Sequence, residues 1–269
     1  MDIDARIIKA GGPDLGSFLA LAVSSWRSAL GRELTGVYVH GSLSTGAFNP
    51  RTSDIDVLVT TRALTDRPAN ERIHEVHRAM HGWGDDRWAD RLEAMFVPAK
   101  ALATSGVPRI AVLELHPDEG FKVQPLSSDF MIQKRILRQQ GITLFGPRIA
   151  KIVAPVTTGE LRDAQIGTLR EWWLPQLEYP GQFLKRFYQA YAVLTMCRAL
   201  CLLATGEVVT KPEAASWATH GPYLEVWHPL IQSAIAYPGG VQTDQRGATL
   251  DFIRFTLEEA GIGHVTPSS

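Results

Sequence analysis

The feature that most constrains this fold is an apolar strand that begins with two aspartates. Residues 54–60 are rich in β-branched side chains and give the strongest strand signal in the chain. A shorter β-rich run, 37–40, precedes them and stops at a Gly-Ser pair. A turn-rich stretch joins the two runs, so the sequence predicts two strands of one sheet with polar groups gathered at their ends.

The two aspartates predict a metal site. Asp54 and Asp56 lie two residues apart, so a strand points both side chains to one face. Two like charges at the end of an apolar strand repel each other and need a cation, and hard oxygen ligands that leave room for phosphates suit Mg²⁺. In the preceding turn, Gly41 allows a tight bend, and the Ser42 hydroxyl and nearby backbone N–H groups can hold phosphate oxygens.

A third carboxylate, Glu93, stands about forty residues later as the solitary acid of a predicted strand at 92–97. Its neighbours Leu92, Ala94 and Phe96 would face the helices, which leaves Glu93 on the other side. If this strand lies beside 54–60, three carboxylates converge, and Glu93 either ligates a metal or takes a proton from an attacking hydroxyl. Such an arrangement suits phosphoryl or nucleotidyl transfer, and its alternative is a solvated strand end.

The remaining pattern predicts an α+β domain followed by a helical one. The first hundred residues alternate predicted helices, at 17–30 and 68–81, with three short strands. Further helices are predicted at 129–140, 159–174, 182–205, 212–219, 223–236 and 245–260. A Pro- and Thr-rich link separates the two parts, so we expect domains at 1–150 and 155–269.

Charge and composition narrow the expected partners and compartment. The formal net charge of −1 gives no global basic field, so nucleic acid is not an expected partner. No run reaches the roughly 18 apolar residues of a membrane span, and the N-terminus lacks the basic start of a signal peptide. We therefore expect a cytoplasmic protein without a membrane partner, as a monomer or weak dimer. Cys197 and Cys201 are expected to be core packing rather than a disulfide or metal site.

Motifs along most of the chain resemble those of a known family. They are His40-Gly41-Ser42 with Asp54-Ile55-Asp56, Asp129 with the exit Leu144-Phe145-Gly146-Pro147, and the runs 194–198, 203–207 and 211–218. These stretches are similar to bacterial aminoglycoside adenylyltransferases that act on streptomycin and spectinomycin, which have the nucleotidyltransferase superfold shared with polymerase β. The resemblance implies an N-terminal mixed-sheet domain and an all-α C-terminal bundle that completes the ATP and acceptor sites. It also implies Mg²⁺-dependent transfer of AMP from ATP to an antibiotic hydroxyl, which confers resistance.

The resemblance assigns roles to individual residues. It makes Asp54, Asp56 and Glu93 the metal and catalytic carboxylates, with Glu93 as the base. The residues expected to bind ATP are Gly41, Ser42, Ser53, Asp129, Arg198, Lys211 and Tyr237. Two of these also stand out by themselves: Arg198 interrupts an apolar helix and needs an anionic partner or a route to water. Thr210–Glu213 has the form of a capping box, which places Lys211 at a helix N-terminus that favours phosphate. The alternative for Arg198 is a structural salt bridge, and the alternative for Lys211 is an ordinary surface lysine.

The acceptor side departs from the family pattern. Tyr188 stands where the streptomycin enzymes have an acidic residue, and Ala111 stands where a tryptophan is expected. Candidate acceptor contacts are Trp172, Trp173, Glu178 and Tyr188, because a cationic sugar needs carboxylates and flat apolar surfaces. Two other functions remain open: the same transfer to another small-molecule or protein hydroxyl, and a non-catalytic nucleotide-binding or antitoxin-like protein. Loss of a carboxylate would favour the second of these, and all three carboxylates are present.

Overall fold

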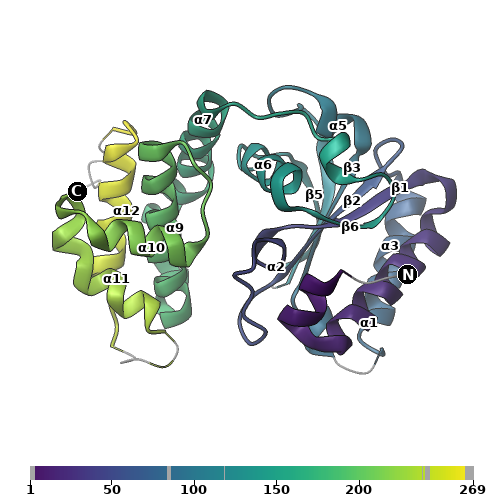
Figure 1. Cartoon of the computed structure of the whole chain (residues 1–269), viewed down its shortest axis with the longest axis horizontal. Coiled ribbons are helices and arrows are strands. Elements are labelled where there is room, and N and C mark those ends of the chain that lie inside the picture. The colour runs from purple at the N-terminus through teal and green to yellow at the C-terminus, as the bar shows by residue number, and fades with distance from the viewer. Residues whose placement is uncertain (1–3, 84–85, 118, 238, 240–242, 264–269) are drawn as a thin grey trace. The chain divides into compact units, whose positions relative to one another are not determined.

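A computed structural model of the chain describes residues 4–263 except 84–85, 118, 238 and 240–242 (Figure 1). The chain divides into two compact units. The first comprises Met1–Leu126 and Gln133–Val156, and the second comprises Ser127–Ile132 and Thr157–Ser269. The domain boundary expected at 150–155 falls close to the point after Val156 where the chain passes into the second unit for good. The short segment Ser127–Ile132, which lies earlier in the chain, also groups with the second unit.

The first unit is built on one mixed six-stranded sheet in the order β5-β4-β3-β2-β1-β6. The strands are β1 (Leu34–Val39), β2 (Ile55–Thr61), β3 (Leu92–Pro98), β4 (Ala111–His116), β5 (Gly120–Pro125) and β6 (Ile142–Phe145). Of the paired strands, β2 and β3 run parallel, and the other pairs are antiparallel. A parallel pair needs a crossover, which α3 (Arg67–Met80) supplies.

Two helices cover one face of this sheet, α1 (Ala5–Leu30) and α3 (Figure 1). Trp26 and Leu19 of α1 and Ile73 of α3 are 1% exposed or less, and they pack in one cluster with strand residues that include Ala94 and Phe96. The expected helix at 17–30 is therefore real but starts earlier, at Ala5, with a kink at Gly12 and Pro13. Glu93, on the opposite side of β3 from Ala94, is left on the face that does not pack against these helices.

The shorter elements of the first unit complete the frame. They are α2 (Gly41–Thr45), α4 (Asp86–Ala89), α5 (Ala99–Ala103), α6 (Phe130–Gln140, which begins in the second unit) and the 3-10 turns at Gly31–Glu33 and Ile149–Lys151. The predicted helix at 129–140 is confirmed by α6. Strands β4, β5 and β6 were not predicted, and β4 proves to carry part of the site.

The regular elements that the structure describes in the second unit are all helical. Its elements are α7 (Thr158–Thr168), a π-helical turn (Leu169–Trp173), α8 (Leu174–Glu178), α9 (Arg186–Thr205), α10 (Lys211–His220), α11 (His228–Ile235), α12 (Arg246–Glu259) and the 3-10 turns at Pro180–Leu184 and Pro222–Trp227. Helix α9 is central, since α7, α10, α11 and α12 all pack on it. The predicted all-α C-terminal region is confirmed.

The core of this unit contains both cysteines and the most apolar helix. Cys197 and Cys201 are free and buried at 0% and 4% exposure, as expected for core packing. Burial raises the pKa of the Cys197 thiol to about 12, which keeps it an unreactive thiol. Contrary to the sequence-based expectation, α9 is long and apolar enough to cross a membrane, but 56% of its most apolar stretch is buried within the protein. Such burial is typical of a core helix.

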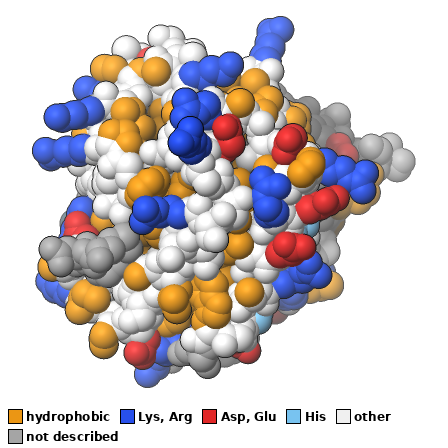
Figure 2. Space-filling view, turned by 90° about the vertical axis from the view of Figure 1, so that its right-hand side faces the viewer, with side chains coloured by type: hydrophobic (Ala, Val, Ile, Leu, Met, Phe, Trp, Pro, Cys, Tyr) orange, Lys and Arg blue, Asp and Glu red, His pale blue; other side chains and the backbone are white. Residues whose placement is uncertain are grey.

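The visible surface carries charges of both signs. Figure 2 shows one face of the molecule, on which Lys and Arg side chains are interspersed with Asp, Glu and hydrophobic ones. This mixture agrees with the formal net charge of −1. Charges of mixed sign do not produce a single strong field over this face.

Candidate active site

The parallel pairing of β2 and β3 places two of the predicted carboxylates side by side. Asp56 is the direct register partner of Glu93, and Ile55 pairs with Leu92. Both acidic side chains are half-buried, and Asp54 lies exposed just before the first residue of β2. The condition set by the sequence, that the Glu93 strand lies beside the aspartate strand, is therefore met.

The Gly-Ser turn at the end of β1 packs against Asp56. Gly41 has φ +58, in the left-handed region that favours glycine, and a Cβ atom there would meet the Asp56 carboxylate. The N–H of His40 donates to the Asp56 carbonyl at 3.0 Å, which ties the turn to β2. Ser42 follows in the single-turn helix α2, and the Ser53 hydroxyl accepts a hydrogen bond from the Asn49 N–H at 2.9 Å. The site residues of the first unit thus share one end of β1 and β2.

Two further polar residues, which sequence reasoning missed, lie next to Glu93. His116 Nδ1 is 3.2 Å from Oε1 of Glu93, and His116 Nε2 is 3.1 Å from Oε2 of Glu114. The Gln124 amide also donates to Glu114. A small pocket in this unit is lined by Glu93, Glu114 and His116 together with His40, Asp56 and Gln133. The only available sequence signal was the spacing Glu114-x-His116, which places both residues on one face of a strand.

The charges of this cluster are coupled. Burial raises the pKa of the Glu93 carboxyl, the His116 hydrogen bond opposes that rise, and the charges of Asp56 and Asp54 add to it. Hydrogen bonds to Glu114 and Glu93 raise the pKa of His116 to about 10, so the imidazole is a cation at neutral pH and can donate from both nitrogens. The Glu93 side chain is still 39% exposed, so a substrate can reach it.

The donor set fits a hard divalent cation, although the side chains do not form a ready-made site. Among the residues that the structure describes, no three Asp, Glu, His or Cys side chains are arranged to hold a metal ion. The expected convergence of three carboxylates on one point is therefore not seen among the described residues. The Glu93 carboxylate instead contacts His116 at 3.2 Å. Asp54 and Asp56 remain neighbouring carboxylates of the type that Mg²⁺ prefers.

The second unit holds the other residues predicted to bind nucleotide. Lys211 begins α10, where Thr210 and Glu213 form the expected capping box. Its Nζ lies 3.9 Å from the centre of the Tyr191 ring. Tyr237 follows α11, and its ring contacts the guanidinium of Arg186 at 5.6 Å.

Two more of these residues lie on the same unit. Arg198 is half-buried on α9. Asp129 accepts a hydrogen bond from Ser127 just before α6. The N–H and hydroxyl of Ser128 donate to Glu171 at 2.9 and 2.7 Å, which ties this short turn to the helical unit.

The four predicted acceptor contacts have different environments. Trp172 is 49% exposed and Glu178 is exposed, whereas Tyr188 is half-buried between Phe183 and Tyr191. Trp173 is only 2% exposed in the core of the unit. The π-helical turn changes the helical phase at this tryptophan pair. Because its ring is buried in this core, Trp173 is a packing residue and is not accessible to an acceptor, contrary to the sequence-based expectation.

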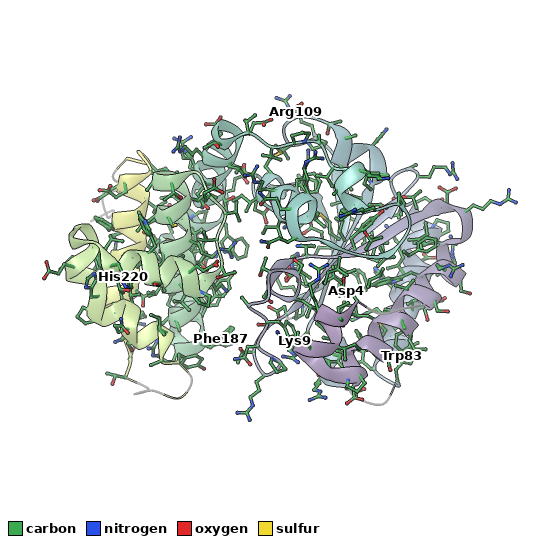
Figure 3. All side chains as sticks on the ribbon, viewed as in Figure 1. Asp4, Lys9, Trp83, Arg109, Phe187 and His220 are labelled. Atoms are coloured by element: carbon green, nitrogen blue, oxygen red, sulfur yellow. The ribbon has the colours of Figure 1, made fainter. Side chains whose placement is uncertain are left out.

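An exposed aromatic side chain that sequence reasoning did not single out lies on the same unit. Phe187, labelled in Figure 3, is 45% exposed in the first turn of α9. The centre of its ring lies 6.4 Å from that of Tyr191 and 6.3 Å from that of Tyr237. Tyr237 and Lys211 are thus connected through one group of aromatic rings.

Known families match both parts of the chain. The nucleotidyltransferase domain family matches residues 24–118. The family described as "aminoglycoside adenylyltransferase, C-terminal domain" matches residues 151–255. Strands β1, β2 and β3 lie within the first match, and Arg198, Lys211 and Tyr237 lie within the second.

Whole-chain comparisons agree. The aminoglycoside (3'') (9) adenylyltransferase of Klebsiella pneumoniae is 24% identical to this chain, and the match covers 81% of this chain and 82% of that protein. The aminoglycoside (3'') (9) adenylyltransferase of Escherichia coli is 23% identical, and the match covers 77% of this chain and 78% of that protein. The crystal structure of spectinomycin adenyltransferase AAD(9) from Enterococcus faecialis, with ATP and spectinomycin, has a TM-score of 0.71 at 15% identity and covers 90% of this chain and 98% of that one. That last likeness establishes the fold. From the two family matches and these relatives together, the chain belongs to the aminoglycoside adenylyltransferase family and is a nucleotidyltransferase enzyme of the adenylyltransferase type.

Proposed function

We propose that the protein transfers AMP from ATP to a hydroxyl of an aminoglycoside-type antibiotic, with streptomycin and spectinomycin as the first acceptors to test. The observation that carries this proposal is the register pairing of Asp56 with Glu93, with Asp54 beside them, in a nucleotidyltransferase domain. The proposal places the reaction in the cytoplasm, where ATP is available. The comparison structure holds ATP and spectinomycin, which supports the choice of ligands.

In the proposed reaction, Glu93 accepts the proton of the acceptor hydroxyl. The hydroxyl oxygen forms a bond to the α-phosphorus of ATP, the bond from that phosphorus to the bridging oxygen breaks, and pyrophosphate leaves. The Glu93 side chain is 39% exposed, so it can come within reach of the acceptor hydroxyl and take its proton. Asp54 and Asp56, with Glu93 as a further donor, would hold Mg²⁺, which neutralises phosphate charge and orients the groups.

The remaining assignments concern binding. Gly41, Ser42 and Ser53 are proposed to contact ATP from the first unit. Asp129, Arg198, Lys211 and Tyr237 are proposed to contact it from the second unit, with the two cations facing phosphate. Trp172, Glu178 and Tyr188 are proposed acceptor contacts.

The proposal is tested by pyrophosphate release from ATP and Mg²⁺ across a panel that includes streptomycin, spectinomycin and several other aminoglycosides. We expect release with at least one member, and mass spectrometry should show the acceptor heavier by one AMP unit. The Asp56→Asn variant is the negative control. Pyrophosphate release only with an acceptor outside the panel would keep the chemistry and overturn the antibiotic assignment, whereas no ATP binding at all would overturn both.

A further inference from the structure

A row of polar side chains crosses one face of the sheet beyond the predicted site. Strand β4 pairs with β3 through Ala94 with Leu115 and Met95 with Glu114. Strand β5 continues the sheet, with Val112 opposite Gln124. Four adjacent strands thus contribute Asp56, Glu93, His116 with Glu114, and Gln124 to one polar row. Its hydrogen-bond contacts run from Glu93 outward to β5.

The side chains of this row differ in how much of their surface is exposed to solvent. Glu93 and Glu114 both line the pocket, but the Glu93 side chain is 39% exposed and that of Glu114 only 8%. A nearly buried carboxylate is stable only when hydrogen-bonded, and His116 and Gln124 supply those bonds. Glu114 is therefore placed to hold His116 rather than to meet a substrate.

We propose that His116, oriented by Glu114, is a positioning residue that fixes the direction of the Glu93 carboxylate for nucleotidyl transfer. Its Nδ1 engages Oε1 of Glu93 at 3.2 Å, so the second oxygen, Oε2, is the one presented to the acceptor hydroxyl or to a metal ion. This inference rests on the proposed role of Glu93. In this inference Glu114 orients His116, and His116 in turn acts on the reaction through Glu93.

Residues that orient a reacting carboxylate affect turnover more than substrate binding, and losing one typically costs about 10- to 100-fold. We expect His116→Ala to lower kcat by about that factor, with the KM for ATP changed less than about twofold. His116→Asn should recover part of the loss, because its amide can still donate toward Glu93. Glu114→Gln should have an intermediate effect, since Gln still accepts from His116 without the charge.

A double-mutant cycle tests whether His116 acts through Glu93. If it does, adding His116→Ala to Glu93→Gln should lower turnover little further. Additive losses would overturn the positioning role. Lys122→Ala is the matched control, since Lys122 is a β5 residue paired in register with Glu114 and hydrogen-bonded to Glu119; it should leave turnover unchanged.

The outcomes separate this inference from the proposed function. If Glu93→Gln keeps full turnover, the assignment of Glu93 fails, whatever His116 does. If Glu93→Gln is inactive but His116→Ala is fully active, the positioning role alone fails. A readout without acceptor is the imidazole ¹⁵N–¹H spectrum, in which Glu93→Gln should shift the Nδ1–H signal of His116 and Lys122→Ala should not. An unchanged signal in Glu93→Gln would also overturn the contact.

Discussion

A Cβ atom on Gly41 would lie 1.8 Å from Oδ2 of Asp56, a separation that no real contact allows. Gly41 also has φ +58, so glycine is required there both by backbone conformation and by space. The pair connects the turn after β1 to the carboxylate at the start of β2. This contact gives the Gly-Ser signal of the sequence a physical meaning: the glycine lets Asp56 lie against the turn.

Gly41→Ala should therefore lose transfer activity, because the new methyl group must displace the Asp56 carboxylate. Gly46→Ala is the matched control: Gly46 has φ +81, and nothing lies within 4 Å of its Cβ position. Both changes should lower the free energy of unfolding, measured in urea, by about 1–2 kcal/mol through left-handed backbone strain. Gly41→Ala should lower it further, because the new methyl group also clashes with Asp56. Only Gly41→Ala should lose most of its turnover, and equal turnover in the two variants would show that the close approach is not needed.

Asp54→Asn and Asp56→Asn should each abolish transfer while the fold persists. Each change removes a charge proposed to bind metal and relieves repulsion between neighbouring carboxylates, so the melting temperature should hold or rise slightly. Asp163→Asn, at an exposed position of α7, is the control and should behave like the parent. Near-normal turnover in both site variants would contradict the assignment of these aspartates.

Glu93→Gln should bind ATP about as well as the parent and turn over roughly 10²–10⁴-fold more slowly, the usual cost of removing a general base. Calorimetry with a non-hydrolysable ATP analogue separates the two effects. Loss of ATP·Mg²⁺ binding in this variant would instead make Glu93 chiefly a metal ligand.

The sequence predicted the parts of the site that depend on local pattern. The strands at β2 and β3 and the capping box of Thr210 and Glu213 are confirmed, because each arises from residues close in the chain. The contact between His116 and Glu93 joins strands β3 and β4, and the charged residues of β4 weaken its strand signal. Such long-range pairs are set by sheet register, which one sequence does not reveal.

The pH dependence of stability should show the contribution of His77. Burial lowers the pKa of His77, and the nearby His81 and His74 lower it further, while Asp90 opposes them. The folded protein therefore binds the His77 proton less readily than the unfolded chain, whose histidine pKa is about 6.5. The stability contributed by neutral His77 is present above that value and is lost as pH falls from about 6.5 toward the lowered folded pKa.

His77→Leu should accordingly reduce the loss of unfolding free energy between about pH 7.5 and 5.5, a window that brackets the ordinary histidine pKa. The ring of His77 contacts Phe121 at 5.4 Å, so an apolar replacement keeps the packing partner. His220→Gln, at an exposed position of α10, is the control and should keep the parental slope. An unchanged slope in His77→Leu would contradict the assignment.

Lys211→Ala should weaken ATP binding by about tenfold or more, the effect of losing one charge-assisted contact of about 1.5–3 kcal/mol. The helix should persist, because Thr210 and Glu213 still form its capping box. Lys211 Nζ also lies 3.9 Å from the centre of the Tyr191 ring, so the competing explanation for a loss is a disturbed packing of the rings of Tyr191, Phe187 and Tyr237. Calorimetry with ATP and with adenosine separates the two causes: a phosphate contact predicts a large loss for ATP and little for adenosine. Equal losses for both ligands would assign Lys211 to the packing of these aromatic rings. Lys151→Ala, at an exposed lysine of the first unit, should change the binding of neither ligand.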